Sequence, residues 1–135
     1  MKLCRMIALV LACGLLLSAC GGNVRHVVPV IGPSEVYESS DIEKAMDVVL
    51  DYFHREFEGC TMTRLEYDEM LVLRSQEEWA AQYDADQAIV LLSDFEVSSF
   101  GGDGSLNPGG AYINWQWILI RNADGDWKLR TWGFG

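Results

Sequence analysis

Residues 40–58 read SDIEKAMDVVLDYFHREFE, and this stretch decides the fold expected for the chain. Its apolar residues recur at intervals of three and four, which places them on one face of a helix. These residues are Ile42, Ala45, Met46, Val49, Phe53 and Phe57. Ser40 followed by Glu43 matches the capping-box pattern of a helix start, and Gly59 is suited to ending the helix. The sequence therefore predicts a long amphipathic helix over about residues 41–58.

The residues after this helix change to the two-residue alternation of β-strands. We expect strands over about residues 60–73, 88–97, 111–121 and 127–134. Ser75 with Glu78 matches a second capping box, which predicts a helix of two turns between the first and second of these strands. Asp124-Gly125 is a strong signal for a hairpin between the last two strands.

The last two strands are rich in aromatic residues, and their register depends on the turn. If the hairpin closes on a two-residue turn, Trp117 faces Trp132 and Trp115 faces Phe134. A turn that is one residue longer, with a bulge, changes the faces. Both alternatives remain open, and in either case four aromatic rings crowd one end of the two strands.

These elements together predict an α+β domain of residues 35–135. An N-terminal helix packs on a curved four-stranded antiparallel sheet, and a short second helix lies between strands 1 and 2. Residues 20–34 contain three glycines and the prolines Pro29 and Pro33, a composition typical of a tether. The valines of residues 27–31 are expected to add a few contacts at a sheet edge.

The amino terminus has the order of a secretory signal. Lys2 and Arg5 precede an apolar run over residues 6–17, which is too short for a membrane-spanning helix of about 20 residues. Leu17-Ser18-Ala19-Cys20 then resembles the lipobox of bacterial lipoproteins. The resemblance implies that residues 1–19 are a signal peptide, that the chain is cut before Cys20, and that the Cys20 sulfur carries a diacylglycerol. Two acyl chains would hold the protein on the outer side of the cytoplasmic membrane.

The charge of the chain excludes one class of partner. The chain has 10 basic and 20 acidic side chains and a net charge of −10. Removal of the leader with its two basic residues, Lys2 and Arg5, makes the net charge −12. Such a charge repels nucleic acids and anionic lipids, so we expect no nucleic-acid partner.

The cysteines predict no internal disulfide. Cys4 and Cys13 leave with the leader and Cys20 would be lipidated, so Cys60 is the cysteine left for the folded domain. A free cysteine behaves as a small hydrophobe, and we expect Cys60 to be buried. A catalytic role would require a nearby base, and the domain offers His26 and His54.

Several motifs make the chain similar to a family of small uncharacterised lipoproteins from gut-dwelling Gram-positive bacteria. They are EGCT (58–61), AIVLLS (88–93), GGDGSLNP (101–108), NWQWIL (114–119) and Trp127. The order of elements also resembles the cystatin-like and nuclear transport factor 2-like folds, in which a curved sheet wraps the first helix. The family has no assigned activity, so the resemblance implies a fold and a location and no reaction.

The glycine-rich segment 101–110 is the first candidate site, because such a connection permits close approach of the backbone to a ligand. It lacks the lysine and the following helix of a phosphate-binding loop. Asp103, Ser105 and Asn107 have oxygens that calcium could use. A ligand-contacting loop and a plain hairpin connection both remain open, and we assign no metal and no other cofactor.

Asp51, His54 and Glu58 share one side of the first helix and are the second candidate. Three such side chains could bind zinc if a fourth ligand arrived from elsewhere. A solvated acidic face of the helix explains the same residues without a metal.

The aromatic residues Tyr112, Trp115, Trp117 and Trp132 are the third candidate. Large rings fill the core of a small domain, and the same rings can bind a sugar or a small apolar ligand at the open end of a cone-shaped fold. With Asp103 and Asn107 of the loop, they form the set of expected ligand-binding residues.

Three functions are compatible with the sequence. The preferred hypothesis is a non-catalytic cell-envelope lipoprotein that displays a small binding domain for an envelope protein, a glycan or a small ligand. The second is a hydrolase or isomerase of the nuclear transport factor 2-like kind, using a buried carboxylate such as Asp94 or Glu96 with a tyrosine. The third is a purely structural or immunity-type module.

Overall fold

A computed structural model describes residues 21–123 and 125–135, so the predicted signal peptide and Cys20 lie outside the described residues. The elements in chain order are β1 (Val28–Ile31), α2 (Ser39–Glu56), β2 (Cys60–Tyr67), α3 (Glu69–Gln82), β3 (Gln87–Val97), β4 (Ala111–Arg121) and β5 (Lys128–Gly133). Neither described helix combines the length and the hydropathy needed to cross a membrane.

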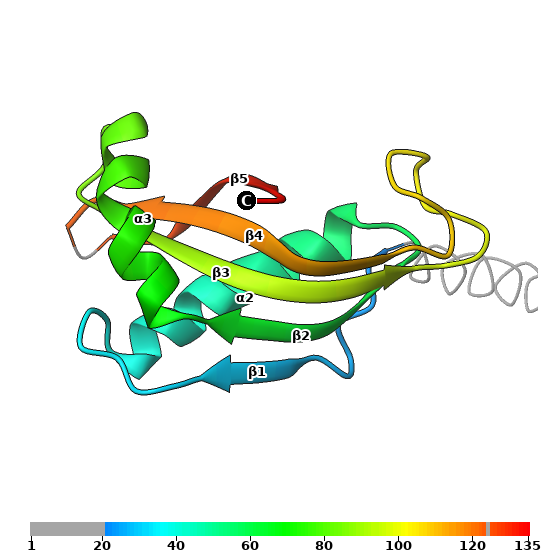
Figure 1. Cartoon of the computed structure of the whole chain (residues 1–135), viewed down its shortest axis with the longest axis horizontal. Coiled ribbons are helices and arrows are strands. Elements are labelled where there is room, and N and C mark those ends of the chain that lie inside the picture. The colour runs from blue at the N-terminus through cyan, green and yellow to red at the C-terminus, as the bar shows by residue number, and fades with distance from the viewer. Residues whose placement is uncertain (1–20, 124) are drawn as a thin grey trace, which may run out of the picture.

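The strands form one five-stranded sheet in the order β1-β2-β3-β4-β5 (Figure 1). β1 pairs with β2 in parallel, and every other neighbouring pair is antiparallel. The α+β class is therefore confirmed, and the prediction of a four-stranded antiparallel sheet is wrong. The additional strand is parallel because α2 connects β1 to β2, and a helical crossover brings the chain back in the same direction.

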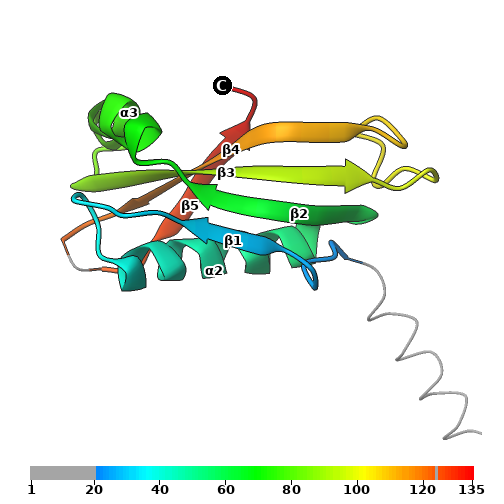
Figure 2. The same cartoon turned by 60° about the horizontal axis from the view of Figure 1, so that its bottom comes forward.

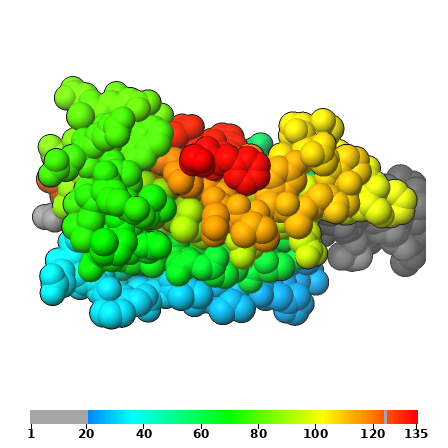
Figure 3. Space-filling model, in the orientation of Figure 1, coloured from blue at the N-terminus to red at the C-terminus, as the bar shows by residue number. Residues whose placement is uncertain are grey.

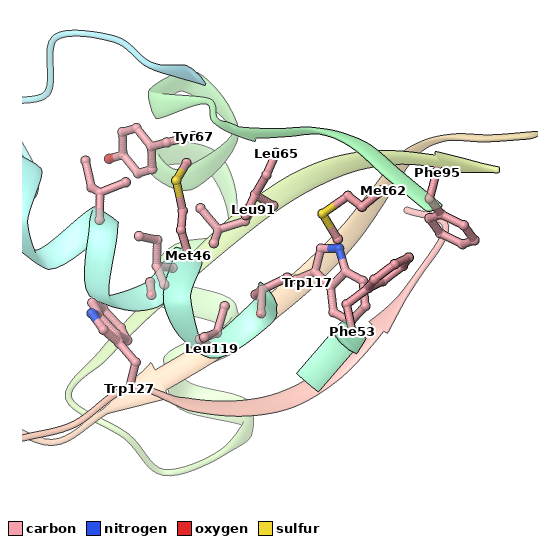
Figure 4. Close-up of a cluster of buried hydrophobic side chains, with 14 of the residues drawn as sticks. Met46, Phe53, Met62, Leu65, Tyr67, Leu91, Phe95, Trp117, Leu119 and Trp127 are labelled. Atoms are coloured by element: carbon pink, nitrogen blue, oxygen red, sulfur yellow. The ribbon is translucent and has the colours of Figure 1, made fainter. Parts of the chain in front are cut away.

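The two helices lie on opposite faces of the sheet, as Figure 2 shows. The predicted apolar stripe of α2 is confirmed, because Ile42, Ala45, Met46, Val49 and Phe53 are buried. These side chains meet inward-facing residues of β2, β3 and β4 in the main core, shown in Figure 4. A smaller cluster of Ala80, Ala88 and Ile120 lies beneath α3.

Both capping predictions are wrong. α2 begins at Ser39, and its N-cap Glu38 makes no side-chain capping bond, so Ser40 lies inside the helix. α3 begins at Glu69 after Asp68, whose carboxylate accepts a hydrogen bond from the Leu71 amide at 3.1 Å. Since this cap starts α3 early, β2 ends at Tyr67, and the second helix has 14 residues rather than two turns.

The segment expected as a tether is packed on the domain from Gly22 to Ile31. The Gly22 amide donates to the His54 carbonyl at 2.9 Å, and the Asn23 amide donates to the Cys60 carbonyl at 2.8 Å. A Cβ on Gly22 would lie 2.3 Å from the Phe53 carbonyl oxygen, so only glycine permits this approach. The prediction of a tether missed this packing, because no local sequence pattern shows where a short segment docks on the domain.

β-Bulges bend the sheet around α2. The β3–β4 register shifts between Ser93 and Phe95, where Asn114 adopts a φ of 56° and its amide donates to Asp94 Oδ1 at 3.0 Å. The extra residue brings both Tyr112 and Trp115 against Phe95, with ring centroids at 5.0 and 5.4 Å. In a regular strand these two aromatic side chains would point to opposite faces.

The last hairpin has the register expected for a two-residue turn at its aromatic end. Trp117 pairs with Trp132, and the ring centroids of Trp115 and Phe134 lie 5.1 Å apart. Nearer the turn, a register shift between Ile118 and Leu119 changes the pairing.

Trp117 lies at the centre of the core and is fully buried. Its ring contacts Phe53 in an edge-to-face arrangement with centroids 6.3 Å apart (Figure 4). Its Nε1 donates to the buried Ser93 Oγ at 2.8 Å. The only polar atom of the indole is thus satisfied, which permits full burial of the ring.

Replacement of Trp117 by Ala is expected to lower the free energy of unfolding by about 3 to 5 kcal/mol, because it leaves a cavity at the centre of the core. Urea denaturation followed by far-ultraviolet circular dichroism measures this change. As a control, Phe100→Ala alters a side chain that is 96% exposed and is expected to change stability by less than about 0.5 kcal/mol. Equal effects of the two substitutions would contradict the placement of Trp117.

The connection between β1 and α2 is held by the carboxylate of Glu69 on α3. This carboxylate accepts hydrogen bonds from Ser34 Oγ, the Tyr67 hydroxyl and the amides of Glu35 and Val36. These donors, the Ser34 hydroxyl above all, hold the pKa of Glu69 below its ordinary value of 4.5.

Because the folded pKa is depressed, ionised Glu69 stabilises the folded state above its ordinary pKa. This contribution is lost as the pH falls through the folded value. We therefore expect Glu69→Gln to lose less stability than the parent chain between about pH 5 and about pH 3, measured by urea denaturation at each pH. Glu78→Gln, on the exposed side of the same helix, serves as the control and should leave the acid dependence unchanged.

Candidate functional site

A cavity of about 410 Å³ lies at one end of the sheet, where the end of α2 meets the start of β2 and the loop of residues 98–110. Figure 3 shows this loop protruding at the end of the molecule opposite α3. The lining residues are Tyr52, Glu56, Phe57, Glu58, Cys60, Gly102, Asp103, Ser105, Leu106, Trp115 and Trp132.

Four aromatic side chains form the apolar part of the lining. Tyr52 and Phe57 come from the end of α2, whereas Trp115 and Trp132 come from β4 and β5. The ring centroids of Tyr52 and Trp132 lie 4.8 Å apart, and Phe57 lies 6.3 Å from Tyr52. Trp132 keeps 39% of its surface exposed, so part of this aromatic wall is available for a ligand.

Trp115 has an unusual environment. Its ring packs edge-on against Phe134 and Phe95, and its Nε1 atom is buried. In residues 21–123 and 125–135, this is the one buried side-chain nitrogen or oxygen without a hydrogen-bond partner. A buried donor without a partner lowers the free energy of unfolding by about 1 to 3 kcal/mol.

The polar part of the lining is acidic. Glu56, Glu58 and Asp103 contribute carboxylates, and the lining drawn from the described residues contains no lysine, arginine or histidine. Hydrogen bonds from the Ser105 hydroxyl and the Ser105 amide hold the pKa of Asp103 below its ordinary value. Arg55 lies at the margin, where its Nη1 is 3.7 Å from Glu56 and its Nε is bonded to Asp51.

Glycines allow the loop to approach the start of β2. The Ser98 amide donates to the Gly59 carbonyl at 2.8 Å, and Gly59 has a φ of 73°. A Cβ on Gly102 would lie 2.2 Å from the Glu58 carbonyl oxygen. The glycines of the loop therefore permit a close backbone contact with the turn before β2, and the approach to a ligand stays a prediction.

Cys60 is buried, as predicted, and is one of the residues that line the cavity. Burial raises the pKa of its thiol to about 11, so the group is a neutral thiol at physiological pH. Cys60 is therefore a wall residue of the cavity and a poor nucleophile.

The structure brings together three of the predicted ligand-binding residues. Trp115, Trp132 and Asp103 line the cavity. Trp117 lies behind the wall in the core. Tyr112 and Asn107 brace the loop instead, because the Asn107 amide donates to the Tyr112 hydroxyl at 3.0 Å.

Sequence reasoning missed Tyr52, Phe57, Glu56 and Glu58 as cavity residues, although all four lie near the end of the helix that the sequence identified. The sequence pattern places Phe57 on the apolar stripe, and in the structure it is partly buried against the core and also lines the cavity. The predicted helix extends to residue 58, whereas α2 ends at Glu56, so the sequence gives no signal that Phe57 lies at an uncovered helix end.

The residues proposed for a metal site on the helix, and the carboxylates proposed for catalysis, have other partners in the structure. His54 Nδ1 is 2.8 Å from the Gly22 carbonyl, and Asp51 pairs with Arg55. Among the described residues, no group of three histidine, cysteine or acidic side chains is arranged to hold a metal. Asp94 accepts from the Asn114 amide and lies 3.5 Å from Arg64, and neither Asp94 nor Glu96 lines the cavity.

Comparison of the chain with protein-family models, with curated proteins and with solved structures finds no match.

Proposed function

We propose that the protein is a non-catalytic cell-envelope lipoprotein whose cavity at the aromatic end of the sheet binds a small ligand or a protruding group of an envelope partner. The observation that carries this proposal is the cavity itself. Its volume of about 410 Å³ lies in the range of about 300 to 1,000 Å³ that is usual for small-molecule sites. Its aromatic wall is also typical of such sites.

The described chain begins beside the cavity, because Asn23 is bonded to the backbone of Cys60, a lining residue. One residue, Gly21, separates Cys20 from Gly22, whose amide is bonded to the end of α2. A lipid on Cys20 would therefore hold the domain close to the membrane rather than on a long tether. Asn23 is bonded to Cys60, and Cys60 and Glu58 line the cavity. A ligand would therefore bind close to the membrane surface.

The family and the finer fold class belong to this proposal as well. Membership of the small-lipoprotein family of gut-dwelling Gram-positive bacteria would fit the leader and the short anchor. A cystatin-like or nuclear transport factor 2-like relationship would fit a helix wrapped by a bent sheet with an opening at one end. The parallel strand β1 and its βαβ connection are features that such a relationship would have to accommodate.

A hydrolase or isomerase acting in the same cavity is the second candidate, because Tyr52 and three carboxylates line it. Burial raises the pKa of the Tyr52 hydroxyl, which keeps the phenol protonated at neutral pH. However, the three carboxylates are solvent-exposed, and a general acid of this type needs a dry environment. Binding is therefore better supported than catalysis, and an open cavity favours both over a purely structural or immunity-type module.

The lipid anchor is tested by Cys20→Ala. This substitution removes the sulfur that would carry the diacylglycerol, so we expect the protein to move from the membrane fraction to the soluble fraction. Immunoblotting of fractionated cells measures the distribution, and mass spectrometry of the parent protein is expected to show a lipid mass on Cys20. Unchanged membrane retention of the variant would refute the anchor.

The cavity is tested by native mass spectrometry of the purified full chain after incubation with the low-molecular-weight fraction of an envelope extract. We expect the parent chain to retain a ligand and Trp132→Ala to lose it, because the substitution removes one aromatic wall. Trp79→Ala is the matched control, since Trp79 packs against Tyr83 on α3. Equal retention by both variants would place the ligand elsewhere.

A further inference from the structure

We propose that the group bound in this cavity is an alkylammonium cation, held between the aromatic rings and the carboxylates of the lining. This inference rests on the binding role proposed above and specifies the chemical class of the ligand. It depends on two features of the lining, its charge and its aromatic rings.

The charge of the lining favours a cation. Glu56, Glu58 and Asp103 are acidic, and no basic side chain is among the described residues that line the cavity. Arg55 at the margin pairs with Asp51 and Glu56 and lies over the Tyr52 ring at 5.9 Å, so Glu58 and Asp103 are the carboxylates left for a cation. The whole chain carries a net charge of −10. Such a surface raises the local concentration of small cations and speeds their association, whereas it repels anionic ligands.

The aromatic side chains provide the second contribution. The negative face of an aromatic ring attracts a cation that lies within about 6 Å of the ring centroid. Tyr52 and Trp132 pack against each other, with ring centroids 4.8 Å apart and an interplanar angle of 47°, and Phe57 lies 6.4 Å from Trp132. A cation would therefore lie against the exposed part of the Trp132 ring, which keeps 39% of its surface accessible. Alkylated ammonium groups match such surfaces because their charge is spread over apolar methyl and methylene groups.

Other ligand classes fit the lining less well. A metal ion needs several converging donors, and the described residues contain no such group of three. A neutral sugar could donate hydrogen bonds to these carboxylates, but it would gain nothing from their charge. Cys60 and Leu106 add only apolar surface. An organic cation requires carboxylates and rings, and both are present.

The cation could be a free small molecule or the headgroup of a membrane lipid, because the cavity lies at the proposed anchored end. Both sources share the alkylammonium chemistry. Choline and phosphatidylcholine represent the two sources and can be compared directly.

The test uses the full chain, purified in a polyoxyethylene detergent whose headgroup carries neither charge nor sugar. Isothermal titration calorimetry measures binding of choline and of its neutral analogue, in which a carbon atom replaces the nitrogen. We expect choline to bind more tightly than the analogue by about tenfold, since the two molecules have the same shape and differ in charge. Equal affinity would overturn the inference and leave the cavity as an apolar binding site.

Matched variants locate the site. Glu58→Gln and Trp132→Leu are each expected to weaken choline binding by about threefold to tenfold. The controls Glu78→Gln and Trp79→Leu make the same changes on α3 and should bind as the parent chain does. Circular dichroism verifies the fold of each variant. Equal weakening by the α3 variants would overturn the assignment of the cation to the cavity.

A further comparison identifies the source of the cation. If phosphatidylcholine vesicles displace choline from the parent chain and vesicles of a neutral glycolipid do not, a headgroup reaches the cavity; if neither displaces it, the ligand is a free cation. Both results require choline binding and support the inference. Absence of choline binding at millimolar concentration overturns it, and the proposed binding function then depends on the native mass spectrometry alone.

Discussion

The central constraint on this fold is that a single bent sheet must cover the apolar face of α2. Phe53 on the helix and Trp117 on β4 meet at the centre of this contact, and both are fully excluded from solvent. Trp117 can be buried only because Ser93 accepts the hydrogen bond of its indole nitrogen. The antiparallel strands provide most of this cover, and β1 extends it at one edge through the crossover that α2 itself creates.

The bending of the sheet also explains the location of the cavity. Bulges let the strands curve around α2, and the bulge at Asn114 turns both Tyr112 and Trp115 toward Phe95. Phe57 follows the last turn of α2, where the helix no longer fills the space beneath the sheet. The glycine-rich loop closes this space on one side by packing against the turn before β2. The cavity is thus the uncovered end of the same core that stabilises the domain.

The proposed function combines this cavity with the proposed anchor. The chain after Cys20 docks immediately on the end of α2, and a domain held in this way would present its cavity close to a membrane. The organic cation proposed as the ligand would match the carboxylates and rings of the cavity, and the acidic character of the chain acts in the same direction. The buried thiol of Cys60 and the partners of Asp94 make a catalytic centre a weaker explanation of the same end of the fold.

The sequence by itself determined the α+β class, the apolar stripe of α2, the aromatic hairpin and the burial of Cys60. These features follow from local periodicity and from the hydrophobicity of single residues, which a linear sequence displays directly. It also identified Trp115, Trp132 and Asp103 as ligand-binding candidates. Tertiary structure alone decided that residues 28–31 form a parallel strand, that Asp68 caps α3, and that Tyr52 and Phe57 complete the cavity. These outcomes depend on which distant segments compete for the same surface, and a bulge of one residue is enough to reverse the face on which a side chain lies.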